Sequence, residues 1–174
     1  MKRVWLLFFS GVILAAGCVK DKREVIFDMI YPNFDFELPA GLNPSFAAVI
    51  EFPSVSSNIA DYLKDNNTDT SAIAAIRPNF ARILSQSGRV FDFLEEVSVR
   101  ICPVGQDCSE FDEIFYLDDM TNRQYNTIEL LPTLRNSKKL LSGARFRLEV
   151  VFFLSEISPF LMECQMDMGL QAVR

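Results

Sequence analysis

Alternation of apolar and polar residues recurs along most of the chain and predicts short β-strands. In residues 97–101, two valines and an isoleucine fall on one side, while Ser98 and Arg100 fall on the other. Residues 144–154 alternate in the same way, which is the two-residue period of a half-buried strand. The same criteria, with turn residues between the runs, predict further strands at 34–39, 46–52, 80–84, 113–117, 126–131 and 161–173.

The period changes in two places and there predicts helix. Apolar residues in 57–67 and 69–76 are spaced as in short amphipathic helices, with Ser, Asn and Thr residues available as caps. Residues 134–143 are expected to form one helical turn that ends at Gly143.

Seven or eight short strands with a helical interruption predict a mainly β protein. The expected architecture is a single antiparallel β-sandwich of the immunoglobulin-like kind, formed by residues 34–174, with one or two short helices. A closed barrel is the alternative arrangement of the same strands.

The first residues have the pattern of an export signal. Lys2 and Arg3 precede an apolar run at 4–16, and charged residues follow from Lys20 onward. A membrane-spanning helix needs about 20 apolar residues, so this run is too short to span a bilayer. We therefore predict a signal peptide at 1–17 that is cleaved before Cys18, followed by a tether at 18–33.

The sequence "AAGC" at 15–18 resembles the lipobox of bacterial lipoproteins. The resemblance implies that Cys18 is lipidated on sulfur before cleavage and then acylated on its new amino group. Several acyl chains would give effectively permanent membrane attachment, at about 0.8 kcal/mol per buried CH₂ group. The alternative is ordinary signal-peptidase cleavage, which would leave a soluble periplasmic protein.

The residues after Cys18 predict the side of the membrane. Surface export signals of such lipoproteins place several acidic residues directly after the lipidated cysteine, whereas here Asp21 lies between Lys20 and Lys22. We expect an outer-membrane protein that faces the periplasm, with the cell surface as the alternative.

A second resemblance covers residues 72–153. Asp92, Phe93 and Leu94 precede a V-x-V-x-I strand, an acidic hairpin follows, and the segment ends in "RFRLEVVF". This layout is similar to small Bacteroidota lipoproteins of unknown function. The resemblance implies a β-sandwich in the cell envelope and brings no catalytic residues.

Charge and composition exclude several classes of function. Without Lys2 and Arg3, 15 basic side chains stand against 23 acidic ones, so the net charge falls from −6 to −8. Such a chain is a poor partner for nucleic acid, which is bound mainly through clustered Lys and Arg. The chain has no histidine, which removes the commonest general base and the usual imidazole metal sites.

Three cysteines remain after Cys18, in what we predict to be an oxidising compartment. Cys102 and Cys108 flank the turn-forming sequence "PVGQD" and are predicted to form a disulfide across a hairpin tip. Cys164 alternates with polar residues and is expected to be buried as a small hydrophobic residue. A metal site at Cys102 and Cys108 is the alternative, although histidine and a C-x-x-C spacing are absent.

Acidic pairs raise the question of catalysis. The candidates for the two carboxyl groups of a glycosidase are Glu95 with Glu96, Asp118 with Asp119, or the group at 110–113. Neighbouring residues of a strand point to opposite faces, so proximity in sequence does not provide that geometry. We predict no enzymatic activity and no cofactor.

The sequence lacks the full patterns of calcium-binding and sugar-binding sites. The sequence "DNNTDT" at 65–70 has alternating oxygen ligands, but it lacks the glycine and glutamate of a calcium-binding EF-hand loop. Sugar-binding surfaces use aromatic residues, but Trp5 is lost with the signal and most phenylalanines fall on inward positions. The sequence therefore predicts a lipid-anchored binding or scaffolding module with an envelope protein as partner. A surface carbohydrate-binding accessory lipoprotein is the alternative.

Overall fold

The computed structural model describes residues 24–120 and 125–174. The predicted signal peptide at 1–17 and the predicted lipidation site Cys18 lie outside these residues.

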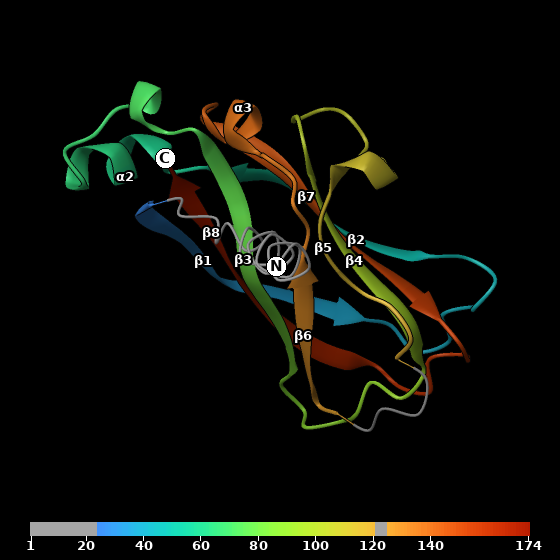
Figure 1. The fold of residues 1–174 in the computed structure, drawn as a ribbon. Helices are drawn as coiled ribbons and strands as arrows, with labels where there is room; N and C mark the ends of the chain where they lie inside the picture. Colours follow the sequence, from blue (N-terminus) through green and yellow to red (C-terminus); the bar gives the residue numbers. More distant parts are fainter. Residues whose placement is uncertain (1–23, 121–124) are drawn as a thin grey trace, which may run out of the picture.

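The described chain forms eight antiparallel strands and short helical segments (Figure 1). The strands are β1 (Val25–Leu38), β2 (Ala48–Ser56), β3 (Ala75–Ser85), β4 (Leu94–Cys102), β5 (Glu113–Leu117), β6 (Thr127–Pro132), β7 (Arg145–Leu154) and β8 (Met162–Val173). The helices are α2 (Ile59–Asp65) and α3 (Lys138–Leu141), and the 3₁₀ turns are η2 (Thr70–Ala72) and η3 (Glu110–Asp112). The prediction of a mainly β, antiparallel protein is confirmed.

The strands belong to one sheet, and the predicted immunoglobulin-like sandwich is not confirmed. The hydrogen-bonded order is β1-β8-β3-β6-β5-β4-β7-β2, and the sheet is rolled nearly into a barrel. Two residue pairs between β5 and β6, Phe115 with Pro132 and Tyr116 with Leu131, connect its two halves. Inward alternation is the same in a sandwich and in a rolled sheet, so the sequence pattern did not separate them.

Aromatic side chains close the seam between the two edge strands, β1 and β2. Phe34 of β1 and Phe52 of β2 meet edge to face, with ring centroids 5.0 Å apart. From α2, the Tyr62 hydroxyl accepts a hydrogen bond from the Ile30 N–H at 2.9 Å and donates one to the Ile30 carbonyl at 3.1 Å. Tyr62 thus covers part of the β1 edge, which would otherwise expose unpaired backbone groups.

Apolar side chains fill the interior of the rolled sheet. The largest fully buried side chains include Phe91, Phe115, Phe146 and Phe152. Cys164 is also buried with a free thiol, and burial raises the pKa of this thiol to about 12. The prediction that most phenylalanines and Cys164 belong to the core agrees with this arrangement.

Two segments differ from their predicted structures. Residues 25–33, expected in the tether, form the first part of β1, which pairs with β8. Residues 69–76, expected to be helical, contain only η2 before β3 begins at Ala75. In both cases pairing with β8, which is distant in sequence, determines the structure, and local propensity does not reveal such pairing.

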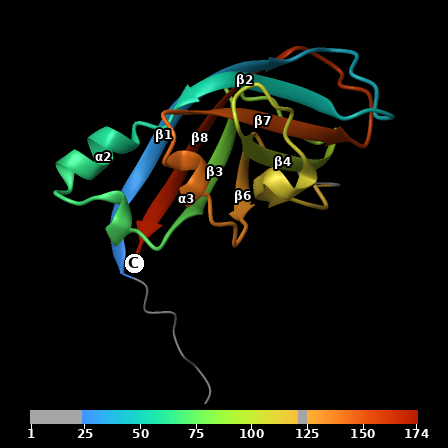
Figure 2. The same ribbon diagram turned by 90° about the horizontal axis from the view of Figure 1, so that it is seen from above.

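Both described termini lie at one end of the barrel, together with α2 and α3 (Figure 2). The Arg174 N–H donates to the Glu24 carbonyl at 3.0 Å. The connections that contain α2, η3 and α3 all leave the sheet at this end, which we call the α3 end. The connections between β1 and β2, β3 and β4, and β7 and β8 lie at the opposite end.

Candidate functional site around the disulfide loop

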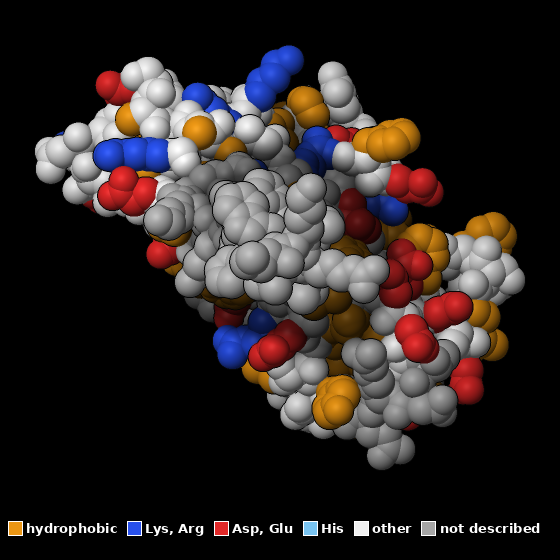
Figure 3. All heavy atoms as spheres, viewed as in Figure 1, with side chains coloured by type: hydrophobic (Ala, Val, Ile, Leu, Met, Phe, Trp, Pro, Cys, Tyr) orange, Lys and Arg blue, Asp and Glu red, His pale blue; other side chains and the backbone are white. Residues whose placement is uncertain are grey.

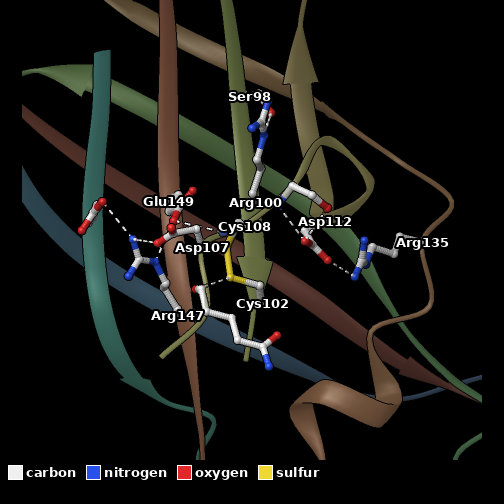
Figure 4. Close-up of a disulfide and its surroundings, with 12 residues drawn as sticks. Ser98, Arg100, Cys102, Asp107, Cys108, Asp112, Arg135, Arg147 and Glu149 are labelled. Carbon is white, nitrogen blue, oxygen red and sulfur yellow. Dashed lines mark hydrogen bonds and ion pairs between the residues drawn. A yellow bond between two sulfur atoms is a disulfide. The ribbon is translucent and has the colours of Figure 1, made fainter. Parts of the chain in front are cut away.

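A disulfide joins Cys102, at the end of β4, to Cys108 in the connection before η3 (Figure 4). Their Cα atoms are 5.4 Å apart. Between them the Gln106 N–H donates to the Pro103 carbonyl at 3.2 Å, and Gly105 has a φ of 82°, which favours glycine. We call residues 102–108 the disulfide loop.

A buried charge cluster lies on one side of this loop. Glu149 of β7 is only 4% exposed and accepts hydrogen bonds from Arg147 Nε at 2.6 Å and from the Cys108 N–H at 3.3 Å. The Arg147 guanidinium also pairs with Glu51 at 2.8 Å and with Asp107 at 3.3 Å. The cluster therefore ties the disulfide loop to β7 and β2.

The alternative metal site at Cys102 and Cys108 can be tested on this geometry. Both sulfur atoms and a Glu149 oxygen lie within 4.8 Å of one another. Zinc and similar ions bind thiolate sulfur, whereas these sulfur atoms are bonded to each other. Glu149 also already faces Arg147, so this donor set does not fit a metal ion while the disulfide is formed.

The charged row continues across the outer face of β4 and β5. Arg100 stands opposite Glu149 on one side and Glu113 on the other. The Ser98 hydroxyl donates to Glu113 at 2.6 Å and accepts from Arg100 Nε at 3.2 Å. Ser98 is fully buried, so its hydroxyl stabilises the sheet and is closed to a substrate.

The structure directs Glu95 and Glu96 to different environments, but it brings Glu96 near Asp118 and Glu113, one residue from each of the other two acidic groups. Glu95 is exposed and Glu96 is half-buried, because they alternate along β4. Burial, together with the nearby carboxylates Asp118 and Glu113, raises the pKa of Glu96. Asp112, in contrast, is held in an ion pair.

On the other side of the disulfide loop is an open basin of about 560 Å³. It is lined by Pro103, Val104, Asp112, Arg135, Asn136, Ser137, Lys139, Leu140 and Arg145. Asp112 pairs with Arg135 at 2.7 Å and accepts two hydrogen bonds from Ser109, each 2.8 Å. Burial raises the pKa of Asp112, but the bonds from Ser109 and Arg135 outweigh it and lower this pKa overall.

The basin is cationic although the chain is acidic. Three cations and one carboxylate line it. Arg145 is bonded to Ser54, whereas exposed Lys139 has no ion-pair or hydrogen-bond partner among the described residues. Figure 3 shows Lys and Arg side chains at the edge where α3 lies in Figure 1, with hydrophobic side chains protruding among them.

Large exposed apolar side chains lie in the connections that line the basin. Phe111 of η3 is 91% exposed and Leu134 is 87% exposed, and Val104 is also exposed. Sequence reasoning singled out none of these residues and none of the basin cations. The available signal was the basic group Arg135, Lys138 and Lys139 within an acidic chain.

The remaining sequence candidates have structural roles in the described residues. Asp69 caps η2 by accepting from the backbone of Ser71 and Ala72, as expected for a polar turn. Tyr31 is buried and donates to the Ser57 carbonyl at 2.8 Å, and Tyr62 closes the seam. Of the four tyrosines, Tyr125 is the most exposed, at 62%.

The chain matches no protein-family model and no curated protein. The resemblance to small Bacteroidota lipoproteins therefore stays a prediction. In the described part of the chain, no helix has the length and apolar character needed to cross a membrane.

Proposed function

We propose that the chain is a lipid-anchored protein of the outer membrane. Its lipid is attached at Cys18, and its domain faces the periplasm and binds or holds another envelope component without catalysis. The lipobox-like sequence at 15–18 supports the anchor, and the net negative charge argues against nucleic acid as the partner.

One observation carries the proposal: the folded domain begins directly after the lipobox-like sequence. Seven residues, 18–24, separate the proposed lipid from β1. Even fully extended, seven residues span about 25 Å. A folded domain whose first strand starts this close to the cysteine is compatible with the lipid as its attachment to the membrane.

The absence of catalysis is proposed from the groups around the disulfide loop. Glu149, Arg147 and Glu113 each face a partner within the protein. A catalytic acid or base must instead reach a substrate. With no histidine in the chain, binding is the function that these groups allow best.

Membrane flotation of Cys18→Ala tests the anchor. We expect the variant to remain unprocessed or to leave the membrane fraction, because Cys18 is the sulfur that would accept the lipid. Cys164→Ala is the matched control and should still float with membranes, since Cys164 lies in the core. Normal processing and flotation of Cys18→Ala would refute the proposal.

Tyr125 favours carbohydrate binding as a second candidate function. It lines an open hollow of about 300 Å³ together with Leu117, Met120, Thr127, Ile128 and Glu129. An exposed aromatic ring beside polar groups suits the face of a sugar. Retention of the protein on a polysaccharide column, lost in Tyr125→Ala, would favour this candidate, as would digestion of the domain by protease added to intact cells.

A further inference from the structure

We propose that the α3 end of the barrel docks on the phospholipid bilayer. In this arrangement Phe111 and Leu134 enter the headgroup layer, while Lys139, Arg135 and Arg145 face lipid phosphates. The inference goes beyond the proposed function and rests on its anchor at Cys18.

The apolar part of this surface is unusually exposed. Phe111 and Leu134 are 91% and 87% exposed and reach out from two different connections. Moving such a side chain out of water is favourable, and the free energy gained grows with the apolar area covered. Exposed apolar side chains next to cations are typical of protein surfaces that lie in a membrane interface.

The ion pair between Asp112 and Arg135 joins the connection between β4 and β5 to the connection between β6 and β7. Phe111 directly precedes Asp112, and Leu134 directly precedes Arg135. A guanidinium nitrogen of Arg135 lies 2.7 Å from a carboxylate oxygen of Asp112. Figure 4 shows this pair on the opposite side of the disulfide from Arg147 and Glu149. Asp112 and Arg135 line the basin together with Lys139, so each of the two exposed apolar residues is the sequence neighbour of a residue that lines the cationic basin.

The charge of this face fits anionic headgroups. A Lys or Arg near an anionic membrane surface strengthens binding, and Lys139 has no competing partner among the described residues. At the opposite end, the connections between β1 and β2, β3 and β4, and β7 and β8 hold two carboxylates, Asp92 and Glu156, and one cation, Arg89. At the α3 end, the connection that carries Lys139 holds three cations and no carboxylate, whereas Asp61, Asp65 and Asp69 lie on the α2 side and Asp107, Glu110 and Asp112 lie in the connection that carries Phe111. We therefore expect the cationic contact at the connection that carries Lys139.

The position of the proposed anchor agrees with this orientation. β1 begins at Val25 at the α3 end, seven residues after the start of the tether at Cys18. A chain of that length reaches about 25 Å at most. A lipid at Cys18 would therefore keep the α3 end, and not the opposite end, close to the bilayer.

A tryptophan reporter tests the proposal on the full chain. The only tryptophan of the sequence, Trp5, lies in the predicted signal peptide, so processed Phe111→Trp would contain a single reporter. Phe46→Trp is the matched control, because Phe46 is 74% exposed in the connection between β1 and β2 at the opposite end. Each processed protein is reconstituted into phosphatidylethanolamine and phosphatidylglycerol vesicles that carry brominated acyl chains.

We expect quenching and a shift to shorter emission wavelength for Phe111→Trp, and neither for Phe46→Trp. In the Phe111→Trp background, Lys139→Glu should reduce quenching, whereas Lys64→Glu on α2 should not. Equal quenching at both positions, quenching at Phe46→Trp alone, or an effect of Lys64→Glu as large as that of Lys139→Glu would overturn the proposal. Protein that floats with vesicles but leaves Phe111→Trp unquenched refutes docking alone, while failure to be processed and float refutes the anchor.

Discussion

Charged residues on the two sides of the disulfide loop differ in burial and in pairing. On the side of β7, Arg147 and Glu149 are nearly buried and face partners within the protein. On the basin side, Lys139 has no partner among the described residues and Phe111 is almost fully exposed. The first arrangement holds the loop on the sheet, and the second leaves groups available for an external contact.

Among changes at the disulfide loop, the largest loss of stability is expected on the buried side. Glu149→Gln should lower the free energy of unfolding by about 3 kcal/mol, because Arg147 loses its closest charged partner in a nearly buried position. Asp107→Asn is the control: Asp107 also pairs with Arg147 but is 94% exposed, so its loss should cost less than about 1 kcal/mol. Urea unfolding measures both. Equal costs would show that burial does not distinguish the two carboxylates.

Removal of the disulfide should have the next largest effect, and it tests whether the loop links the two sides. The double variant Cys102→Ser and Cys108→Ser should lose about 2 kcal/mol of stability, as expected for a bond that closes a short loop. In the unaltered protein, non-reducing mass spectrometry should find Cys102 bonded to Cys108. Two freely alkylated thiols at 102 and 108 would contradict the bond.

The third described cysteine, Cys164, should resist alkylation until the protein unfolds, because its thiol pKa of about 12 and its burial suppress the reactive thiolate.

A smaller loss of stability is expected for a substitution of Asp112, which lies in the connection that follows the disulfide loop. Asp112→Asn should cost about 1 kcal/mol near neutral pH, because the side chain of Asp112 both caps η3 and pairs with Arg135. The pKa of Asp112 is lowered in the folded protein, so its contribution is present above the unfolded pKa of about 3.9 and is lost as pH falls below it. The difference in unfolding free energy between the two proteins should therefore vanish in acid. A difference that grows as the pH falls would contradict this assignment.

The smallest effect on stability is expected on the exposed side. Phe111→Ser and Leu134→Ser should each change the free energy of unfolding by less than about 0.5 kcal/mol, while Phe115→Ala in the core should cost about 4 kcal/mol. Thermal or urea unfolding of the three variants compares them. A large loss in Phe111→Ser would mean that this ring stabilises the fold, and it would remove the contrast between the two sides.

Local pattern was sufficient for much of the strand content. The alternation in 97–101 and 144–154 corresponds to β4 and β7, and the turn predicted before Gly143 corresponds to α3. The spacing of Cys102 and Cys108 around turn residues likewise suits the loop that the structure shows. These features depend on residues close in sequence, whose side-chain directions follow from the backbone period.

The candidate site was only partly visible in the sequence. Cys102 and Cys108 were singled out, but Arg147 and Glu149 only fell within the strand predicted at 144–154. Phe111, Leu134 and Lys139 were not singled out at all. The basin combines the connection between β4 and β5 with the connection between β6 and β7. An ion pair between residues 112 and 135 has no local signature.

Tertiary structure alone decided how the strands close. A two-residue period states which side chains face inward, but it does not say which strands are neighbours, so the single sheet and the inclusion of 25–33 in β1 could not be read from it. Pairing with β8, in which partners are 124 to 148 residues apart in sequence (Leu38 with Met162 and Val25 with Val173), settled that boundary. The sequence by itself determined the faces of the strands, the acidic composition and the lipobox-like start, because each depends on residue type and local order. The sheet order and the exposed cationic basin depend on contacts between distant segments, and only folding brings those segments together.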